Sequence, residues 1–535
     1  MSQPLPSEPR RFAWWPFALV GFTCALYFDT FFHEFTYDDI DCILKNDALR
    51  DISNLAALLD PARYFEVAVE TSYRPVVTLM YFIESALFGT NPTGFHAFGI
   101  LLHAACGVLT ASLCLRLGLD RPPAFFAAAV FLSHPAATEV VNSVGFHEDL
   151  IALFFLLAAL TMTLHGTAGR PVQMVGATLL YFLALLSKEV SIFFPCAVWF
   201  ILRRQGWDVG QRLRMMAWLG AALAIYAMLR FSVFLPPPDV RTIYKPGDMP
   251  VKETVLTMSV IAVNYIRLFF LPIGLCAAHP VFVYTQINAV AAAAIAVLAG
   301  FGALFVRSRL FPVRLGGLWC ALFLLPVSQI VATAQPSSER FLYVPLAGAT
   351  IAFVAAWDDH FSDSRVWRRW IPCLIVLALS ALTFQRNPVW RTQEILFKNV
   401  VRKYPNSSFA LNALGARAFG LGYDALAESY FKQAIAHQPA NYHYLANLAT
   451  LYFRMMRYAE SIPILEDMMA IHPEDGNPRL KLAWSYWMTG DYEKCRRQVK
   501  TLRRVPLRDT RDQASFKELE GNIAALGDTG SIRPR

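Results

Sequence analysis

Eleven apolar stretches alternate with short charged loops, and this pattern limits the fold more than any other feature. A helix needs about 20 apolar residues to cross a bilayer. The stretches are 13–32, 95–117, 121–133, 148–168, 171–187, 189–203, 214–234, 286–306, 311–333, 341–357 and 368–384. Only 16% of the 535 residues are charged, whereas soluble domains carry about 25%. We therefore predict an all-α chain that begins with a polytopic membrane helix bundle.

Basic residues gather in alternate loops, and this sets the expected orientation. Arg/Lys-rich loops face the cytoplasm, which places the N-terminus with Arg10 and Arg11 there and the loop 33–94 outside. A further apolar stretch, 254–275, contains Asn264 and Arg267, so we interpret it as interfacial or re-entrant. About 11 spans then place residues 385–535 outside as well. The same loops account for the net charge of +8 without a nucleic-acid partner.

The C-terminal part repeats with a period of 34 residues, shown by Pro405, Pro439 and Pro473. Small and apolar residues recur between these prolines, which is typical of tetratricopeptide repeats. Each repeat is a helix hairpin that hides its apolar face by stacking on its neighbours. We expect a membrane domain at 1–390 and an α-solenoid at 391–535. Its expected parts are repeats at about 408–441, 442–475 and 476–508 and a capping helix at about 510–525.

Ionisable residues cluster at the outer ends of the apolar stretches. Two adjacent acids, Asp38 and Asp39, follow the first stretch. Carboxylates are costly near lipid, and adjacent acids persist most easily where a cation or a hydrogen-bond donor needs them. Further candidates are Arg74, His96, His103, His134, Glu139, His147, Glu148, Asp149, Lys188, Glu189, Glu339, Arg340 and Tyr343. Solvated loop acids and helix-packing histidines remain alternatives, and the histidine and acid spacing does not indicate zinc.

The mixture of acids and cations has a chemical logic. Arg and Lys at neighbouring helix ends suit the phosphate of a lipid-linked donor. A carboxylate in the same cavity suits removal of a proton from an acceptor hydroxyl. We therefore expect an outer site in which membrane lipid carries the donor.

The order of the motifs resembles that of a known family. The motifs are Tyr37-Asp38-Asp39, Tyr73-Arg74-Pro75, His134-Pro135 with Glu139, Lys188-Glu189, Glu339-Arg340-Phe341-Leu342-Tyr343-Val344-Pro345, and Arg386-Asn387 with Trp390. Together with the repeats, they are similar to the tetratricopeptide-containing transmembrane O-mannosyltransferases and their bacterial relatives. Those proteins are class-C glycosyltransferases, and the resemblance implies that fold type here.

The resemblance implies inverting transfer of a sugar, mannose or similar, from a polyprenyl phosphate to a hydroxyl acceptor. The acceptor would be Ser or Thr of a translocated protein, presented by the repeats. Asp38 would be the general base, and Asp39 would orient it, bind the acceptor or help to hold a divalent metal. No cofactor is otherwise implied. Glu139 would be a second acid, and Lys188 and Arg340 would bind the donor phosphate. Supporting residues would be Arg74, His134, His147, Glu189, Glu339 and Tyr343.

Two departures from the family pattern are visible. His147 stands where the family usually has an arginine, and the tail has only about three repeats. Two other functions therefore stay open, a non-catalytic membrane scaffold for envelope assembly and a transporter of lipid-linked sugar. The composition favours a bacterial inner membrane with periplasmic repeats, and an endoplasmic reticulum membrane with luminal repeats is the alternative.

Overall fold

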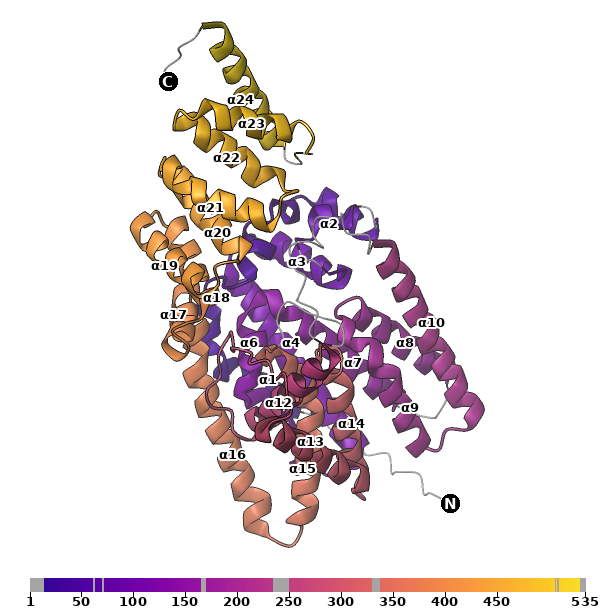
Figure 1. Ribbon diagram of the computed structural model, residues 1–535. Coiled ribbons are helices and arrows are strands. Elements are labelled where there is room, and N and C mark those ends of the chain that lie inside the picture. Colours follow the sequence, from indigo (N-terminus) through magenta and orange to yellow (C-terminus); the bar gives the residue numbers. More distant parts are fainter. Residues whose placement is uncertain are drawn as a thin grey trace. The chain divides into compact units, whose positions relative to one another are not determined.

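The computed structural model describes residues 14–60, 63–69, 72–164, 170–233, 250–329, 337–505, 507 and 510–529. These residues form helices and turns and contain no strand, which confirms the all-α prediction. The chain divides into two compact units, Met1–Gln393 and Glu394–Arg535 (Figure 1). Arg10, Arg11 and residues 334–336, which we assigned to loops, lie outside the described residues.

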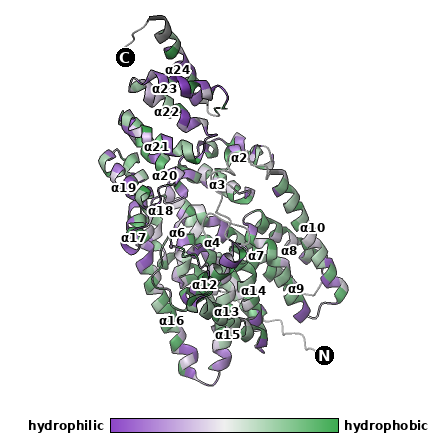
Figure 2. Cartoon of the chain, viewed as in Figure 1, coloured by the Kyte–Doolittle hydropathy of each residue, from purple (hydrophilic) through white to green (hydrophobic). Residues whose placement is uncertain are grey.

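The first unit is a bundle of helices, with four short 3₁₀ or π turns among the described residues of the long connection between α1 and α2. Its helices are α1 (Trp15–Leu26), α2 (Tyr64–Val67), α3 (Pro75–Phe88), α4 (Pro92–Arg116), α5 (Arg121–Ser133), α6 (Thr138–Asn142), α7 (His147–Thr163), α8 (Pro171–Leu185), α9 (Phe194–Arg204), α10 (Val209–Val233), α12 (Val251–Phe270), α13 (Ala289–Arg307), α14 (Phe311–Leu324), α15 (Tyr343–His360) and α16 (Arg365–Arg386). Hydrophobic residues predominate along these helices (Figure 2). Proline opens α3, α4 and α8, where its fixed φ suits a first turn and its missing N–H costs nothing.

Seven helices among the described residues are long and apolar enough to cross a membrane, or eight if the bent pair Arg121–Ser133 and Pro135–Asn142 is one span. Four shorter apolar helices, α1, α3, α8 and α14, accompany them. The count of eleven spans stays a prediction. The stretch that we interpreted as interfacial or re-entrant overlaps α12, a continuous helix of 20 residues that is one of the seven. Its placement in the membrane stays a prediction.

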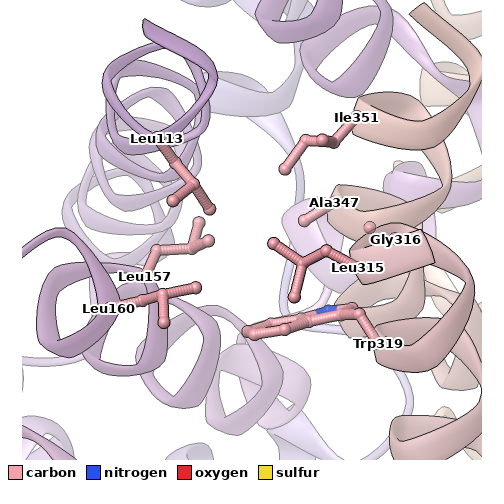
Figure 3. Close-up of a pocket in the computed structure, with 9 residues that line it drawn as sticks. Leu113, Leu157, Leu160, Leu315, Gly316, Trp319, Ala347 and Ile351 are labelled. Carbon is pink, nitrogen blue, oxygen red and sulfur yellow. The ribbon is translucent and has the colours of Figure 1, made fainter. Parts of the chain in front are cut away.

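The core of the first unit lies mainly among α4, α5, α7, α8, α14 and α15. Glycines allow α14 and α15 to approach each other closely, since a Cβ on Gly316 of α14 would overlap the carbonyl oxygen of Gly348 on α15. A small cavity lies where leucines of α4 and α7 point toward α14 and α15 (Figure 3). Leu113 and Leu157 face Trp319 and Ile351 there. The lining is apolar, so this cavity offers nothing to a phosphate.

The second unit consists of successive helix pairs. Its helices are α17 (Gln393–Lys403), α18 (Ser408–Gly420), α19 (Asp424–His437), α20 (Tyr442–Arg454), α21 (Tyr458–Ile471), α22 (Gly476–Met488), α23 (Tyr492–Leu502) and α24 (Thr510–Thr529). The first helix of each pair begins 34 residues after the previous one, at Ser408, Tyr442 and Gly476. Gly415 leaves room for Phe431 within the first pair. Assignment of the pairs to the tetratricopeptide class stays a prediction.

Candidate functional site

Asp39 connects the loop after α1 to the segment between α6 and α7. Its carboxylate accepts hydrogen bonds from the Thr36 N–H at 3.0 Å, the Ser143 hydroxyl at 2.9 Å and the Gly145 N–H at 2.6 Å. The side chain is fully buried, and burial raises the pKa of Asp39 to about 7 although these donors lower it. Both oxygens of Asp39 are therefore occupied by the protein itself.

Asp38 is exposed, in contrast to its neighbour. The surrounding atoms desolvate its carboxyl and raise the pKa of Asp38 to about 6, while the charge of Arg340 opposes this shift and that of Glu148 adds to it. Tyr37, directly before it, has a left-handed backbone with φ of 58°. Such a conformation costs about 1–3 kcal/mol in a non-glycine residue and is common at functional sites. Asp38 is thus the more exposed residue of the pair, and its carboxyl has no hydrogen-bond partner in the described structure.

Arg340 is brought to the same loop from far along the chain. It lies in a 3₁₀ turn, Glu339–Leu342, that leads into α15. Its guanidinium carbon lies 4.0 Å from the ring centroid of Phe146. The ring of Tyr37 packs against the same phenylalanine, at 5.4 Å between centroids. A cation held on an aromatic face beside a carboxyl can bind the phosphate of a donor.

Two buried glutamates hold the turn that carries Arg340. Glu139 accepts hydrogen bonds from the Ser338 hydroxyl at 2.8 Å and from the Arg340 backbone N–H at 3.1 Å. Glu339 contacts His279 at 2.9 Å and Arg386 at 3.4 Å, and it also accepts the Cys276 N–H. Both carboxylates therefore position backbone and neighbouring side chains in the described structure.

An ion-pair network lies beside the acidic loop. Arg74 binds Glu189 through two nitrogens, at 3.2 and 3.0 Å, and Glu148 through the third, at 2.6 Å. Lys188 contacts Glu148 at 3.2 Å and is hydrogen-bonded to Asp149. Glu148 and Asp149 occupy the first turn of α7, where negative charge favours helix formation. Both acids are candidates from the sequence to which we assign no role, although adjacent acids at the start of an apolar helix are a visible signal.

Three of the supporting residues take part in helix packing. His134 Nδ1 accepts the Ala136 N–H at 3.2 Å, which leaves Nε2 to donate to the Phe269 carbonyl at 3.0 Å. The Tyr343 hydroxyl contacts His103 at 2.8 Å. Neither ring nitrogen of His147 has a hydrogen-bond partner in the described part of the chain. His147 lies in the space that the missing side chain of Gly99 leaves, away from the ion pairs.

A divalent metal at Asp38 and Asp39 does not fit this arrangement. Metal-binding carboxylates need free oxygen lone pairs, whereas those of Asp39 face three hydrogen-bond donors. Nowhere in the described ranges do three or more His, Cys, Asp or Glu residues form a group that could hold a metal. We derive no step through a metal.

Comparison with known proteins gives relatives of one kind. The chain is 25% identical over 490 residues to the mouse "Protein O-mannosyl-transferase TMTC3", with 83% of this chain and 53% of the relative covered. It is 22% identical over 520 residues to the human "Protein O-mannosyl-transferase TMTC1", covering 81% and 56%. A 147-residue stretch is 34% identical to the human "Protein O-mannosyl-transferase TMTC2", covering 26% and 18%.

Two of these relatives, TMTC3 and TMTC1, match most of this chain. The chain spans about half of the length of each. No family model matches the chain. A solved Archaeoglobus fulgidus oligosaccharyltransferase is similar with a TM-score of 0.41 and 13% identity, covering 71% of this chain and 57% of that one. A score of this size carries no conclusion about a shared fold, so the class-C assignment stays a prediction. The relatives confirm the resemblance that we inferred from the motifs. Together with the apolar helices, they identify an integral, multi-pass membrane protein.

Proposed function

We propose that this homologue of the tetratricopeptide-containing transmembrane O-mannosyltransferases is itself a membrane glycosyltransferase. It moves a sugar, mannose or similar, from a polyprenyl phosphate to a Ser or Thr hydroxyl of a translocated protein, with inversion at the anomeric carbon. The observation that carries the proposal is the meeting of Asp38 and Arg340 at one loop, where the charge of the arginine acts on the carboxyl.

Asp38 is the general base in this mechanism. Its carboxylate takes the proton from the acceptor hydroxyl while the hydroxyl oxygen attacks the anomeric carbon. The bond between that carbon and the phosphate oxygen breaks, and the polyprenyl phosphate leaves with the bonding electrons. Asp38 is the better candidate of the pair because it is exposed, while three donors engage Asp39. Asp39 is a positioning residue that shapes the loop.

Arg340 is the principal ligand of the donor phosphate. Its guanidinium stabilises the charge that develops on the leaving phosphate, and such a contact is stronger in the transition state than in the ground state. Glu139 positions Arg340 through the backbone hydrogen bond. Lys188 must break its contact with Glu148 or Asp149 before it can bind a phosphate. We therefore assign it a second, weaker contact with the donor phosphate.

The remaining assignments follow from the sequence pattern and the resemblance. The helix pairs of the second unit present the acceptor polypeptide, as expected of repeats that bind extended chains. A bacterial inner membrane with periplasmic repeats, or an endoplasmic reticulum membrane with luminal repeats, is the place of action. The scaffold function differs in one respect that can be measured, because it requires no acid at position 38.

The decisive experiment measures sugar transfer by purified protein from a panel of polyprenyl-phosphate sugars to Ser/Thr peptides. Asp38→Asn keeps the shape and removes the proton acceptor, so transfer should fall by about 10²–10⁴-fold. Asp47→Asn is the matched control, because Asp47 is an exposed acid of the same loop that pairs with exposed Arg50. Equal activity of wild type and Asp38→Asn would contradict the assignment. Folded protein that transfers no sugar from any donor would favour the scaffold.

A further inference from the structure

A groove lies at the opposite end of α15 from the candidate site. Apolar residues of α13 and α15 form its walls, among them Ala303, Leu304 and Phe353. At one end the lining becomes polar, with Arg307, Ser308, Asp359 and His360. The groove is therefore amphiphilic, with an apolar length and a polar end.

The polar end of the groove carries an available positive charge. Asp359 is paired with Arg309 at 3.0 Å, and the adjacent Asp358 is paired with Arg368 at 2.8 Å. Arg307 is exposed, and its guanidinium has no ion pair or hydrogen bond in the described part of the chain. The Ser308 oxygen accepts the Leu310 N–H at 3.2 Å, which leaves its O–H able to donate. An anionic ligand would meet one arginine and one hydroxyl donor there.

The apolar walls face the hydrocarbon region. Both α13 and the helix that contains α15 are long and apolar enough to cross a membrane. Only 11% of the apolar window of α13 is buried, so most of that helix faces outward. Arg307 is its last residue, at the level where a span meets lipid headgroups. A ligand with a hydrocarbon chain and an anionic head matches this layout.

A bilayer crossed by α15 would place the groove and the candidate site in opposite leaflets. Arg340 precedes α15, whereas His360 is its last residue. Twenty helical residues rise by about 30 Å, the thickness of the hydrocarbon core. The lipid donor that meets Arg340 cannot place its phosphate at Arg307 at the same time. The occupant is thus a lipid of the membrane itself.

We propose that this groove binds one anionic phospholipid of the bilayer. Its phosphate contacts the Arg307 guanidinium and the Ser308 hydroxyl, and an acyl chain lies along Ala303, Leu304 and Phe353. The site is independent of the proposed transferase activity, because it lies in the other leaflet and uses no residue of the acidic loop.

The test measures lipid retention by the full-length purified protein. Protein in detergent is titrated with phosphatidylglycerol or phosphatidylcholine of the same chain length, and bound lipids are counted by native mass spectrometry. Wild type should retain one phosphatidylglycerol at least about ten-fold more strongly than phosphatidylcholine, as expected of a charge-assisted contact. Arg307→Gln should abolish that preference, and Ala303→Trp should weaken retention of both lipids by filling the groove.

Arg369→Gln is the matched control. Arg369 is an exposed arginine near the start of α16, does not line the groove and has no side-chain partner among the described residues. Equal loss of retention in Arg307→Gln and Arg369→Gln would overturn the proposal in favour of a diffuse positive surface. Competition by short-chain polyprenyl phosphate at this site, or a change from dimer to monomer in Arg307→Gln, would overturn it in favour of the donor or a second copy. An unchanged melting temperature of Arg307→Gln without added lipid shows that the variant is folded.

Discussion

The carboxylate of Glu139 accepts the backbone N–H of Arg340 at 3.1 Å, across 201 residues of sequence. The other carboxylate oxygen of Glu139 accepts a hydrogen bond from the Ser338 hydroxyl. Glu139 thus fixes the backbone on which the proposed phosphate ligand stands. This relationship distinguishes a positioning acid from a catalytic one.

Glu139→Gln should retain activity within about ten-fold of wild type. The amide oxygen can accept the Arg340 N–H, and the amide nitrogen can donate to the Ser338 hydroxyl. Glu139→Ala removes both contacts and should lower kcat/KM by roughly 100-fold or more, since misplacement by about 1 Å can have that effect. Steady-state kinetics on both variants checks this. An equal loss of activity in Glu139→Gln and Glu139→Ala would mean that the reaction needs the ionisable carboxyl of Glu139.

Gly145→Ala should disturb the acidic loop. A Cβ at this position would lie 3.1 Å from the Asp38 Cβ and 3.2 Å from an Asp39 oxygen. Both are tight contacts, so the loop must shift, and we expect kcat to fall by roughly 10–100-fold with the fold retained. Gly302→Ala is the control, because nothing lies near that glycine. Wild-type kinetics in Gly145→Ala would show that the loop tolerates displacement.

The pH profile should report the proposed base. Only the carboxylate form of Asp38 accepts a proton, and the pKa of Asp38 is raised to about 6 by desolvation. Activity should therefore be full above this value and fall about ten-fold per pH unit below it. The measurement is kcat/KM between about pH 4.5 and pH 8. The acid limb should vanish in the residual activity of Asp38→Asn, and a limb that persists there belongs to another group.

Arg74→Lys should destabilise the membrane unit. Arg74 binds Glu189 with two nitrogens and Glu148 with a third, and lysine cannot reproduce this fork. We expect the free energy of unfolding in detergent to fall by about 1–3 kcal/mol. Arg63→Lys provides the contrast, because the Arg63–Glu66 pair is exposed and such pairs contribute at most about 1 kcal/mol. A similar loss in both variants would contradict the importance of the buried network.

The sequence predicted the helical class, because apolar length depends on local sequence. It also predicted that Asp38 and Arg340 stand at the ends of apolar stretches, where the structure has them. It could not predict which ions pair. The Arg74–Glu189 contact joins residues 115 apart, and no periodicity encodes it. The polar residues of α12 give a second example. Arg267 donates to the Asn264 side chain at 2.9 Å and to the Ile273 carbonyl at 3.2 Å, and the sequence pattern could not predict these partners.

Asp38 lies in the first tenth of the chain and Arg340 near the end of the first unit. During synthesis the acid therefore emerges long before its cation. A nascent chain that stops before α15 contains the proposed base, its loop and most of the hydrophobic core, yet it lacks the phosphate ligand. Because of the order of the two residues along the chain, the proposed reaction cannot take place until almost the whole membrane unit has been inserted.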